Sequence, residues 1–210
     1  RFYDGAFTAD DDNALWRRGW IKRDELPEYG RIVIALDPAT TNNTGSDETG
    51  IVVAGLGGDQ RGYVLADESG KFRPEEWARR AISLYDTFSA DCIVAEVNQG
   101  GDMVEALIKA EARGRTIPVR KVTATRAKHV RAEPVAALYE QGKVKHAQEF
   151  PTLEDQMCAF TVDFDRKAQG YSPDRVDALV WAMTELFPGM TERAPDPSRY
   201  AIPRRKGWMR

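Results

Sequence analysis

Residues 31–38 have the sequence RIVIALDP, in which five consecutive apolar side chains precede Asp37 and Pro38. A short apolar run bounded by turn signals is typical of a strand that is buried on both faces of a sheet. Pro38 ends the strand because proline has no backbone N–H to donate to a neighbouring strand. The run therefore predicts a central strand that carries a carboxylate at its C-terminal end.

The segments that follow predict a mixed sheet flanked by helices. Polar turns separate the first strand from two β-branched runs at 50–56 and 62–67, which predicts an antiparallel meander of three strands. Two more apolar strands, at 91–97 and 117–122, alternate with helices. The expected helices cover about 74–88, 103–108, 125–141, 152–160 and 172–187. Three antiparallel strands followed by alternating strands and helices are the order of the ribonuclease H-like α/β fold.

The overall composition indicates a folded domain without a membrane role. The chain has 210 residues, of which 42% are hydrophobic, and this suffices for one domain with a buried core. Cys92 and Cys158 lie far apart and follow no disulfide or zinc spacing, which favours a reducing, cytoplasmic setting. No apolar run approaches the roughly 20 residues that are needed to cross a bilayer. The two histidines, His129 and His146, are expected on the surface or facing DNA.

The net charge of −3 hides one strongly basic segment. Residues 113–145 contain nine lysines and arginines but only two acidic residues. Within this segment, Arg126, Lys128 and Arg131 recur at helical spacing, and we expect them to hold DNA phosphates independently of base sequence. The alternative interpretation is a solvated helix face whose charge acidic neighbours balance.

Acidic residues stand at places where a carboxylate needs a partner. Asp37 and Glu96 each end an apolar strand, and the carboxyl ends of adjacent parallel strands meet where open α/β sheets place ligands. Asp174 and Asp177 are three residues apart at the start of the last expected helix, so both face one side of its first turns. Each acid alone has a structural explanation, since carboxylates also favour the first turn of a helix. Together, the four predict a shared site.

This site has the composition of a metal centre. Carboxylates that converge without histidine or cysteine favour a hard cation, Mg²⁺ or Mn²⁺, over zinc. Two such ions about 3.5–4 Å apart can activate a water molecule and stabilise the leaving oxygen of a phosphodiester. We expect Asp37 to bridge both ions, Glu96 to hold one, and Asp177 with help from Asp174 to hold the other.

The motifs around these acids resemble those of a known family. They are Ala35-Leu36-Asp37-Pro38-Ala39, Asp47-Glu48-Thr49-Gly50-Ile51-Val52, Val94-Ala95-Glu96 with Asn98-Gln99-Gly100-Gly101, Pro134-Val135-Ala136, and Ser172-Pro173-Asp174-Arg175-Val176-Asp177-Ala178-Leu179. In order and spacing, the chain resembles the C-terminal nuclease domain of the large terminase subunit of tailed bacteriophages, prophages and gene-transfer particles. The resemblance implies a metal-dependent endonuclease that cuts concatemeric double-stranded viral DNA during genome packaging, in the cytoplasm of the bacterial host. The implied partners are double-stranded DNA, the portal protein and the small terminase subunit.

The resemblance also implies a domain arrangement. In that family an ATPase domain precedes the nuclease, but this chain has no GxxxxGK[ST] phosphate loop and begins with Arg1. We therefore expect an isolated nuclease domain. Its expected parts are a connector over 1–30 from the missing ATPase domain, a ribonuclease H-like domain over 31–188, and an irregular tail over 189–210.

Three other functions stay open at this point. The element Asp174-Arg175-Val176-Asp177-Ala178-Leu179 is similar to one in Holliday-junction resolvases, which share the fold and the metal chemistry. The segment 36–41 is similar to the phosphate-binding hairpin of actin-like ATPases and sugar kinases, although those proteins need glycine where Pro38 or Ala39 stands. A non-catalytic module that docks on DNA or on a portal would use the basic segment, and its acids would be structural.

Overall fold

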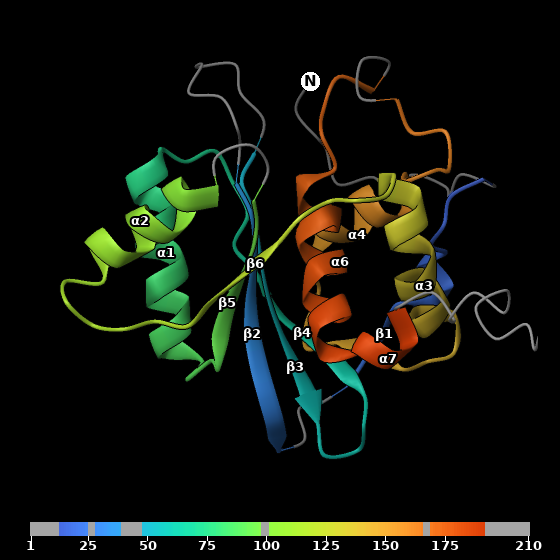
Figure 1. Ribbon diagram of the computed structural model, residues 1–210. Helices are drawn as coiled ribbons and strands as arrows, with labels where there is room; N and C mark the ends of the chain where they lie inside the picture. The colour runs from blue at the N-terminus through green and yellow to red at the C-terminus, as the bar shows by residue number, and fades with distance from the viewer. Residues whose placement is uncertain (1–12, 25–27, 39–47, 98–100, 166–168, 192–210) are drawn as a thin grey trace, which may run out of the picture.

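The computed structural model describes residues 13–24, 28–38, 48–97, 101–165 and 169–191. These residues form a seven-stranded sheet with helices on both faces (Figure 1). The strand order is β1-β7-β4-β3-β2-β5-β6. Parallel and antiparallel pairs both occur, so the predicted mixed α/β sheet is confirmed, and the strand order agrees with the predicted ribonuclease H-like fold.

The strands are β1 (Lys22–Arg23), β2 (Tyr29–Asp37), β3 (Gly50–Gly57), β4 (Gly62–Asp67), β5 (Cys92–Glu96), β6 (Val119–Val122) and β7 (Val144–His146). The meander β2-β3-β4 is antiparallel, as predicted, whereas β5 runs parallel to β2 and β6 runs parallel to β5. At the other edge, β7 is parallel to β4 and β1 is parallel to β7. The parallel pair β2-β5 places the C-terminal ends of two apolar strands side by side.

Helices cover both faces of the sheet. The longer ones are α1 (Pro74–Thr87), α2 (Gly101–Glu111), α3 (Lys128–Glu140), α4 (Pro151–Cys158) and α6 (Asp174–Leu186), and the shorter ones are η1 (Arg18–Trp20) and α7 (Pro188–Thr191). Figure 1 shows α1 and α2 on one face and α3, α4 and α6 on the other. The strands and longer helices expected from the sequence lie within three residues of the observed bounds. In the described part of the chain, no helix is both long enough and apolar enough to span a membrane.

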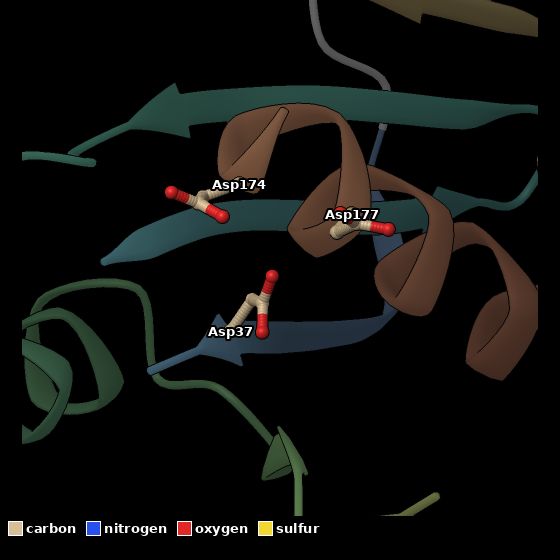
Figure 2. Close-up of side chains that lie close together, drawn as sticks. All are labelled: Asp37, Asp174 and Asp177. Carbon is tan, nitrogen blue, oxygen red and sulfur yellow. The ribbon is translucent and has the colours of Figure 1, made fainter. Parts of the chain in front are cut away.

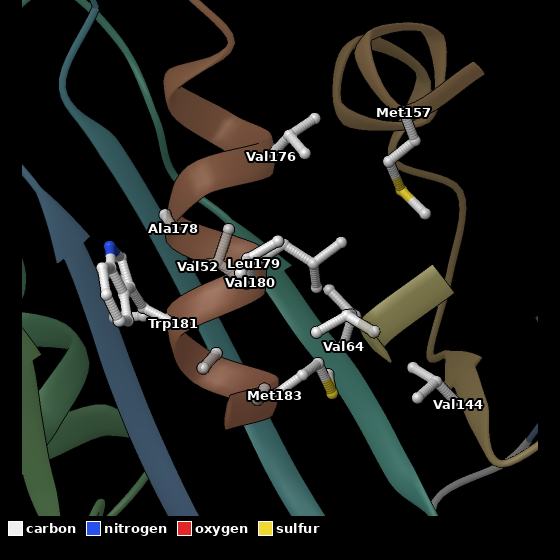
Figure 3. Close-up of a cluster of buried hydrophobic side chains, with 14 of the residues drawn as sticks. Val52, Val64, Val144, Met157, Val176, Ala178, Leu179, Val180, Trp181 and Met183 are labelled. Carbon is white, nitrogen blue, oxygen red and sulfur yellow. The ribbon is translucent and has the colours of Figure 1, made fainter. Parts of the chain in front are cut away.

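Two apolar cores lie on opposite faces of the sheet, and β2 contributes to both. Val33 and Ala35 point into the core beneath α6, whereas Ile34 and Leu36 point into the core beneath α1 and α2. All four side chains are 0% exposed. The continuous apolar run of β2 is therefore explained by burial on both faces, because successive side chains of a strand alternate between faces. Figure 3 shows the α6 core, in which helix side chains meet those of β3, β4 and β7.

The segment before β2 packs against this fold. Trp16 is 0% exposed in the α6 core, and Ala14 forms a bridge to Thr161. Strand β1 extends the sheet next to β7, and neither strand was predicted. They have two and three residues, too few for periodicity to be visible in the sequence. The boundary of the nuclease domain at residue 31 stays a prediction, and most of the expected tail over 189–210 lies outside the described residues.

The expectation of a surface position for His146 is wrong. Its side chain is 0% exposed and lies between Tyr139 Oη and Glu154 Oε1, each 2.9 Å from a ring nitrogen. Glu154 also accepts hydrogen bonds from Arg23 of β1, the shorter at 2.6 Å. A buried polar group is costly unless hydrogen bonded. This network satisfies such groups while it ties β1, β7, α3 and α4 together.

We expect the free energy of unfolding to fall in acid because of this network. Burial lowers the pKa of His146, so stability is lost as the pH falls below the unfolded value of about 6.5. Burial alone would raise the pKa of Glu154, but hydrogen bonds from His146, the Phe150 N–H and Arg23 lower it to about 2. A further loss therefore runs from about pH 4.5 down to about pH 2.

Urea unfolding of the wild type and of Glu154→Gln measures this effect. At about pH 7 the variant should be less stable by roughly 2–3 kcal/mol. A neutral side chain loses the ion pair with Arg23 and the charge that strengthens its hydrogen bonds. The difference should shrink by about pH 3.5, where the unfolded wild type takes up a proton that the folded protein does not. A difference that stays constant over this range would contradict the assignment.

Candidate metal centre

Three aspartates from two distant parts of the chain meet at one end of the sheet. Asp37 is the last residue of β2, and Asp174 and Asp177 lie in the first turn of α6. Each offers a carboxylate oxygen, and these oxygens all lie within 4.8 Å of one another (Figure 2). Asp174 and Asp177 are buried, and Asp37 is half-buried. The structure thus brings together three of the four acids that the sequence singled out.

A glycine in β3 allows α6 to begin directly on the sheet. Gly50 is paired with Asp37 across β2 and β3. A Cβ atom at Gly50 would lie 2.0 Å from the carbonyl oxygen of Asp174 and 3.0 Å from Cβ of Ala178. Real Cβ atoms do not approach a backbone oxygen so closely, so the position needs glycine. The contact places Asp174 above the strand that neighbours Asp37.

Arg175 fixes the first turn of α6, and the sequence analysis did not identify this role. Its guanidinium donates to Asp67 at the end of β4 (2.6 Å), to Glu48 (2.9 Å) and to the carbonyl oxygen of Ser69 (3.1 Å). The side chains of Arg175 and Asp67 are 12% and 4% exposed. Nothing in the sequence indicates these partners, because an arginine between two acids is equally consistent with a local ion pair.

The electrostatics of the group favour a bound cation. Burial raises the pKa of Asp37 well above its usual value, and the charges of Asp177, Glu96 and Asp174 raise it further. Burial also raises the pKa of Asp177, although two basic side chains lie beside it. Like charges this close resist joint ionisation unless a counter-ion is present. A donor set of carboxylates alone suits Mg²⁺ or Mn²⁺, so the residues fit the predicted type of metal.

A sequence model of the Terminase RNaseH-like domain matches residues 34–186, a range that contains all three aspartates. The chain belongs to this family. The match supports the terminase prediction over the resolvase and actin-like alternatives. No curated protein sequence matches the chain.

Solved structures of terminase nucleases share the fold of this terminase domain. The nuclease domain of the large terminase subunit of bacterial virus Sf6 is 15% identical with a TM-score of 0.63, and covers 81% of this chain and 98% of its own. A mutant of that domain with manganese is 14% identical with a TM-score of 0.61, and the match covers 81% of this chain and 98% of the mutant chain. The large terminase nuclease from thermophilic phage G20c with bound magnesium is 16% identical with a TM-score of 0.59, and the match covers 83% of this chain and 98% of the phage chain. At these identities the likeness shows the fold alone.

Two basic side chains from α3 of the terminase domain pair with Asp177. Lys128 Nζ donates to Asp177 Oδ2, and the Arg131 guanidinium donates to Oδ1 at 3.0 Å. Burial alone would lower the pKa of Lys128, but the charge and hydrogen bond of Asp177 raise it overall. A DNA-phosphate role for Arg126, Lys128 and Arg131 stays a prediction. Arg131 is 10% exposed, whereas Lys128 is 45% exposed and Arg126 is exposed, so the latter two are more accessible to a phosphate.

Much of the basic segment is neutralised within the terminase domain. At least six of its nine basic residues form ion pairs with acids outside the segment: Arg115 with Asp86, Arg120 with Glu185, Lys121 with Glu105, Lys128 and Arg131 with Asp177, and Lys145 with Asp24. Exposed pairs are weak and can exchange partners. The segment is therefore not a continuous, uncompensated positive stripe, contrary to the impression that its sequence gives.

The fourth acid, Glu96, lies outside the compact group of aspartates. It is 7% exposed at the end of β5. Its Oε2 accepts a hydrogen bond from Trp181 Nε1 at 2.6 Å and lies 3.8 Å from the Arg131 guanidinium. Its charge nevertheless contributes to the raised pKa of Asp37. Glu96 is thus near the aspartates, and its role as a metal ligand stays a prediction.

Proposed function

We propose that this terminase domain is a metal-dependent endonuclease that hydrolyses phosphodiester bonds of double-stranded viral DNA during genome packaging. One observation carries the proposal: Asp37, Asp174 and Asp177 converge within 4.8 Å in a member of the Terminase RNaseH-like family. The magnesium- and manganese-containing structures of phage terminase nucleases, described above, support the same chemistry. Magnesium or manganese is accordingly the proposed cofactor.

Each acid has a proposed part in holding two ions. Asp37 would bridge both, Asp177 with Asp174 would hold one, and Glu96 would hold the other. Such a pair supplies activation of a water molecule and charge neutralisation at the leaving oxygen of an in-line displacement. The protein's contribution is to hold the carboxylates in place on β2, β5 and α6. Strand pairing positions β2 and β5, and the close contact at Gly50 positions α6.

The basic residues next to the acids have a proposed part in holding DNA. Lys128 is half-exposed and pairs with Asp177, so it can turn to a phosphate once a cation neutralises that aspartate. Arg126 lies just before α3 and is exposed. Such contacts are independent of base sequence and position the backbone. Arg131 is largely buried, so of the three side chains it is the least accessible to DNA.

The family also supplies the proposed setting. We place this domain after an ATPase domain, through a connector over 1–30, with the nuclease over 31–188 and a tail over 189–210. Its proposed partners are the portal protein and the small terminase subunit. Its proposed place of action is the cytoplasm of the bacterial host.

A plasmid-cutting assay tests the proposal. Supercoiled DNA with Mn²⁺ or Mg²⁺ should be nicked and linearised by the wild type, and a chelator should abolish cutting. Asp174→Ala should lower the rate at least about 10-fold, because it removes a proposed ligand. Asp163→Ala changes an exposed aspartate of a turn and serves as the matched control.

Two outcomes would redirect the assignment. Binding of DNA without any cutting by the wild type, at any concentration of either metal, would favour the docking module. Cutting confined to four-way junctions, with linear duplexes left intact, would favour a resolvase.

A further inference from the structure

We propose that Trp181 is a positioning residue that orients Glu96 toward the metal centre, an inference that rests on the proposed function. The indole Nε1–H of Trp181 donates to Glu96 Oε2 at 2.6 Å. Both residues are buried, at 7% exposure. Trp181 itself touches neither DNA nor metal in this proposal, and it acts through the carboxylate that it holds.

The position of Trp181 on α6 links it to the aspartates. It follows Asp177 by four residues, so the two lie one turn apart on the same face of the helix. Figure 3 shows its ring projecting from the side of α6 opposite to Leu179 and Met183, which point into the apolar cluster. One helix therefore carries a proposed ligand and also the donor that holds a second proposed ligand on β5.

Arg131 completes the arrangement from α3. Its guanidinium carbon lies 4.9 Å from the centroid of the Trp181 ring, in a cation–π contact. The same group lies 3.0 Å from Asp177 Oδ1 and 3.8 Å from Glu96 Oε2. Arg131 thus restrains the ring and spans the two carboxylates, which fixes the spacing between Glu96 on β5 and Asp177 on α6.

The chemistry of an indole suits this role. A buried carboxylate needs hydrogen-bond donors, and tryptophan donates through Nε1 without accepting or titrating. The bond engages Oε2 alone. Within the described part of the chain, the other oxygen, Oε1, takes part in no hydrogen bond or ion pair. One oxygen is therefore held while the other stays available as a ligand.

Mn²⁺ binding to the 210-residue chain tests the inference without relying on activity. Free Mn²⁺ is counted by electron paramagnetic resonance for wild type, Trp181→Phe, Glu96→Gln and the double variant. Trp181→Phe keeps most of the ring volume but removes the donor. We expect it to weaken the Glu96-dependent part of Mn²⁺ binding by about 10- to 100-fold, as is usual when a ligand loses its supporting hydrogen bond. In the Glu96→Gln background, the same change should have no further effect.

The controls separate the inference from a general loss of structure. Trp77→Phe replaces a tryptophan that is 2% exposed on α1, against the other face of the sheet. It should bind Mn²⁺ as tightly as the wild type does. The inference is overturned if Trp181→Phe binds Mn²⁺ like the wild type, or weakens binding equally with and without Glu96. It is also overturned if Glu96→Gln leaves Mn²⁺ binding unchanged. If Asp37→Asn, measured in the same way, binds Mn²⁺ as tightly as the wild type, the proposed function itself is refuted instead.

A second measurement keeps the test valid if Trp181→Phe does not fold. The indole N–H resonance of Trp181, recorded on the ¹⁵N-labelled wild type, reports directly on its hydrogen bond. We expect this resonance to shift in Glu96→Gln and on titration with diamagnetic Mg²⁺. An indole resonance that responds to neither change would contradict the coupling between Trp181 and the centre.

Discussion

Replacing Asp37 with asparagine is expected to abolish DNA cutting and, in the same protein, to raise the stability of the metal-free fold. Asp37 lies within 4.8 Å of Asp174 and Asp177, and burial together with their charges raises its pKa well above the usual value. A neutral amide of the same shape removes this repulsion. We expect a gain of roughly 0.5–2 kcal/mol in the free energy of unfolding, typical for relief of strain at a functional site.

The activity should change in the opposite direction. An amide oxygen is a poorer ligand than a carboxylate for a hard cation, and Asp37 is the proposed bridge between both ions. The cutting rate should therefore fall at least about 100-fold. Mn²⁺ should also reverse the order of stability, because a ligand at a hundredfold excess over its Kd stabilises the wild type by about 2.7 kcal/mol.

Thermal unfolding with chelator and with Mn²⁺, next to the plasmid assay, measures all three effects. Asp86→Asn, which neutralises an exposed aspartate paired with Arg115, is the control and should show neither the gain nor the loss. If the metal-free Asp37→Asn variant is less stable than the wild type, then Asp37 stabilises the fold, and repulsion between it and the other aspartates does not explain its effect.

The second large effect is expected at Gly50, where a single methyl group should displace a helix. In Gly50→Ala the new Cβ would meet the carbonyl oxygen of Asp174 at 2.0 Å and its carbonyl carbon at 2.7 Å. Both are backbone atoms, so no side-chain rotation relieves the clash, and the start of α6 must move away from β3. We expect a loss of about 3 kcal/mol in stability, at the upper end for overpacking a core.

The displacement should reach the metal centre, because Asp174 and Asp177 both lie in that first turn. A misplacement of about 1 Å can lower a catalysed rate on the order of 100-fold. Urea unfolding and Mn²⁺ affinity of the variant test the two parts. Gly30→Ala is the matched control, since its Cβ would have its nearest neighbour, the carbonyl oxygen of Leu56, at 3.9 Å. Equal behaviour of the two variants would show that the approach of α6 to β3 is not critical.

Local sequence was sufficient to predict the order of the elements and the acids at their ends. The run from Ile32 to Leu36 predicts a strand buried on both faces, and its side chains are divided between two cores as expected. The three-residue spacing of Asp174 and Asp177 places both on one side of a helical turn without reference to any other part of the chain. Such features depend on the periodicity of strands and helices, which a sequence contains directly.

The partners of the acids were not predictable in this way. Sequence analysis did not identify Asp177 as the partner of Lys128 and Arg131, because it lies 49 and 46 residues away from them. Their expected contact with DNA phosphates stays a prediction. Nor did it identify the donor to Glu96, a tryptophan 85 residues further along the chain. The strands β1 and β7 form only where they can add to an existing sheet edge.

The sequence of this terminase domain by itself determined the longer strands and helices, and it determined where carboxylates stand on them. The tertiary structure decided which charges neutralise one another, which side chain donates to Glu96, and how close α6 comes to β3. The physical reason is the separation along the chain of the residues that interact. Backbone periodicity is set by neighbours a few residues apart, whereas ion pairs, burial and close packing depend on which distant side chains the fold places in contact.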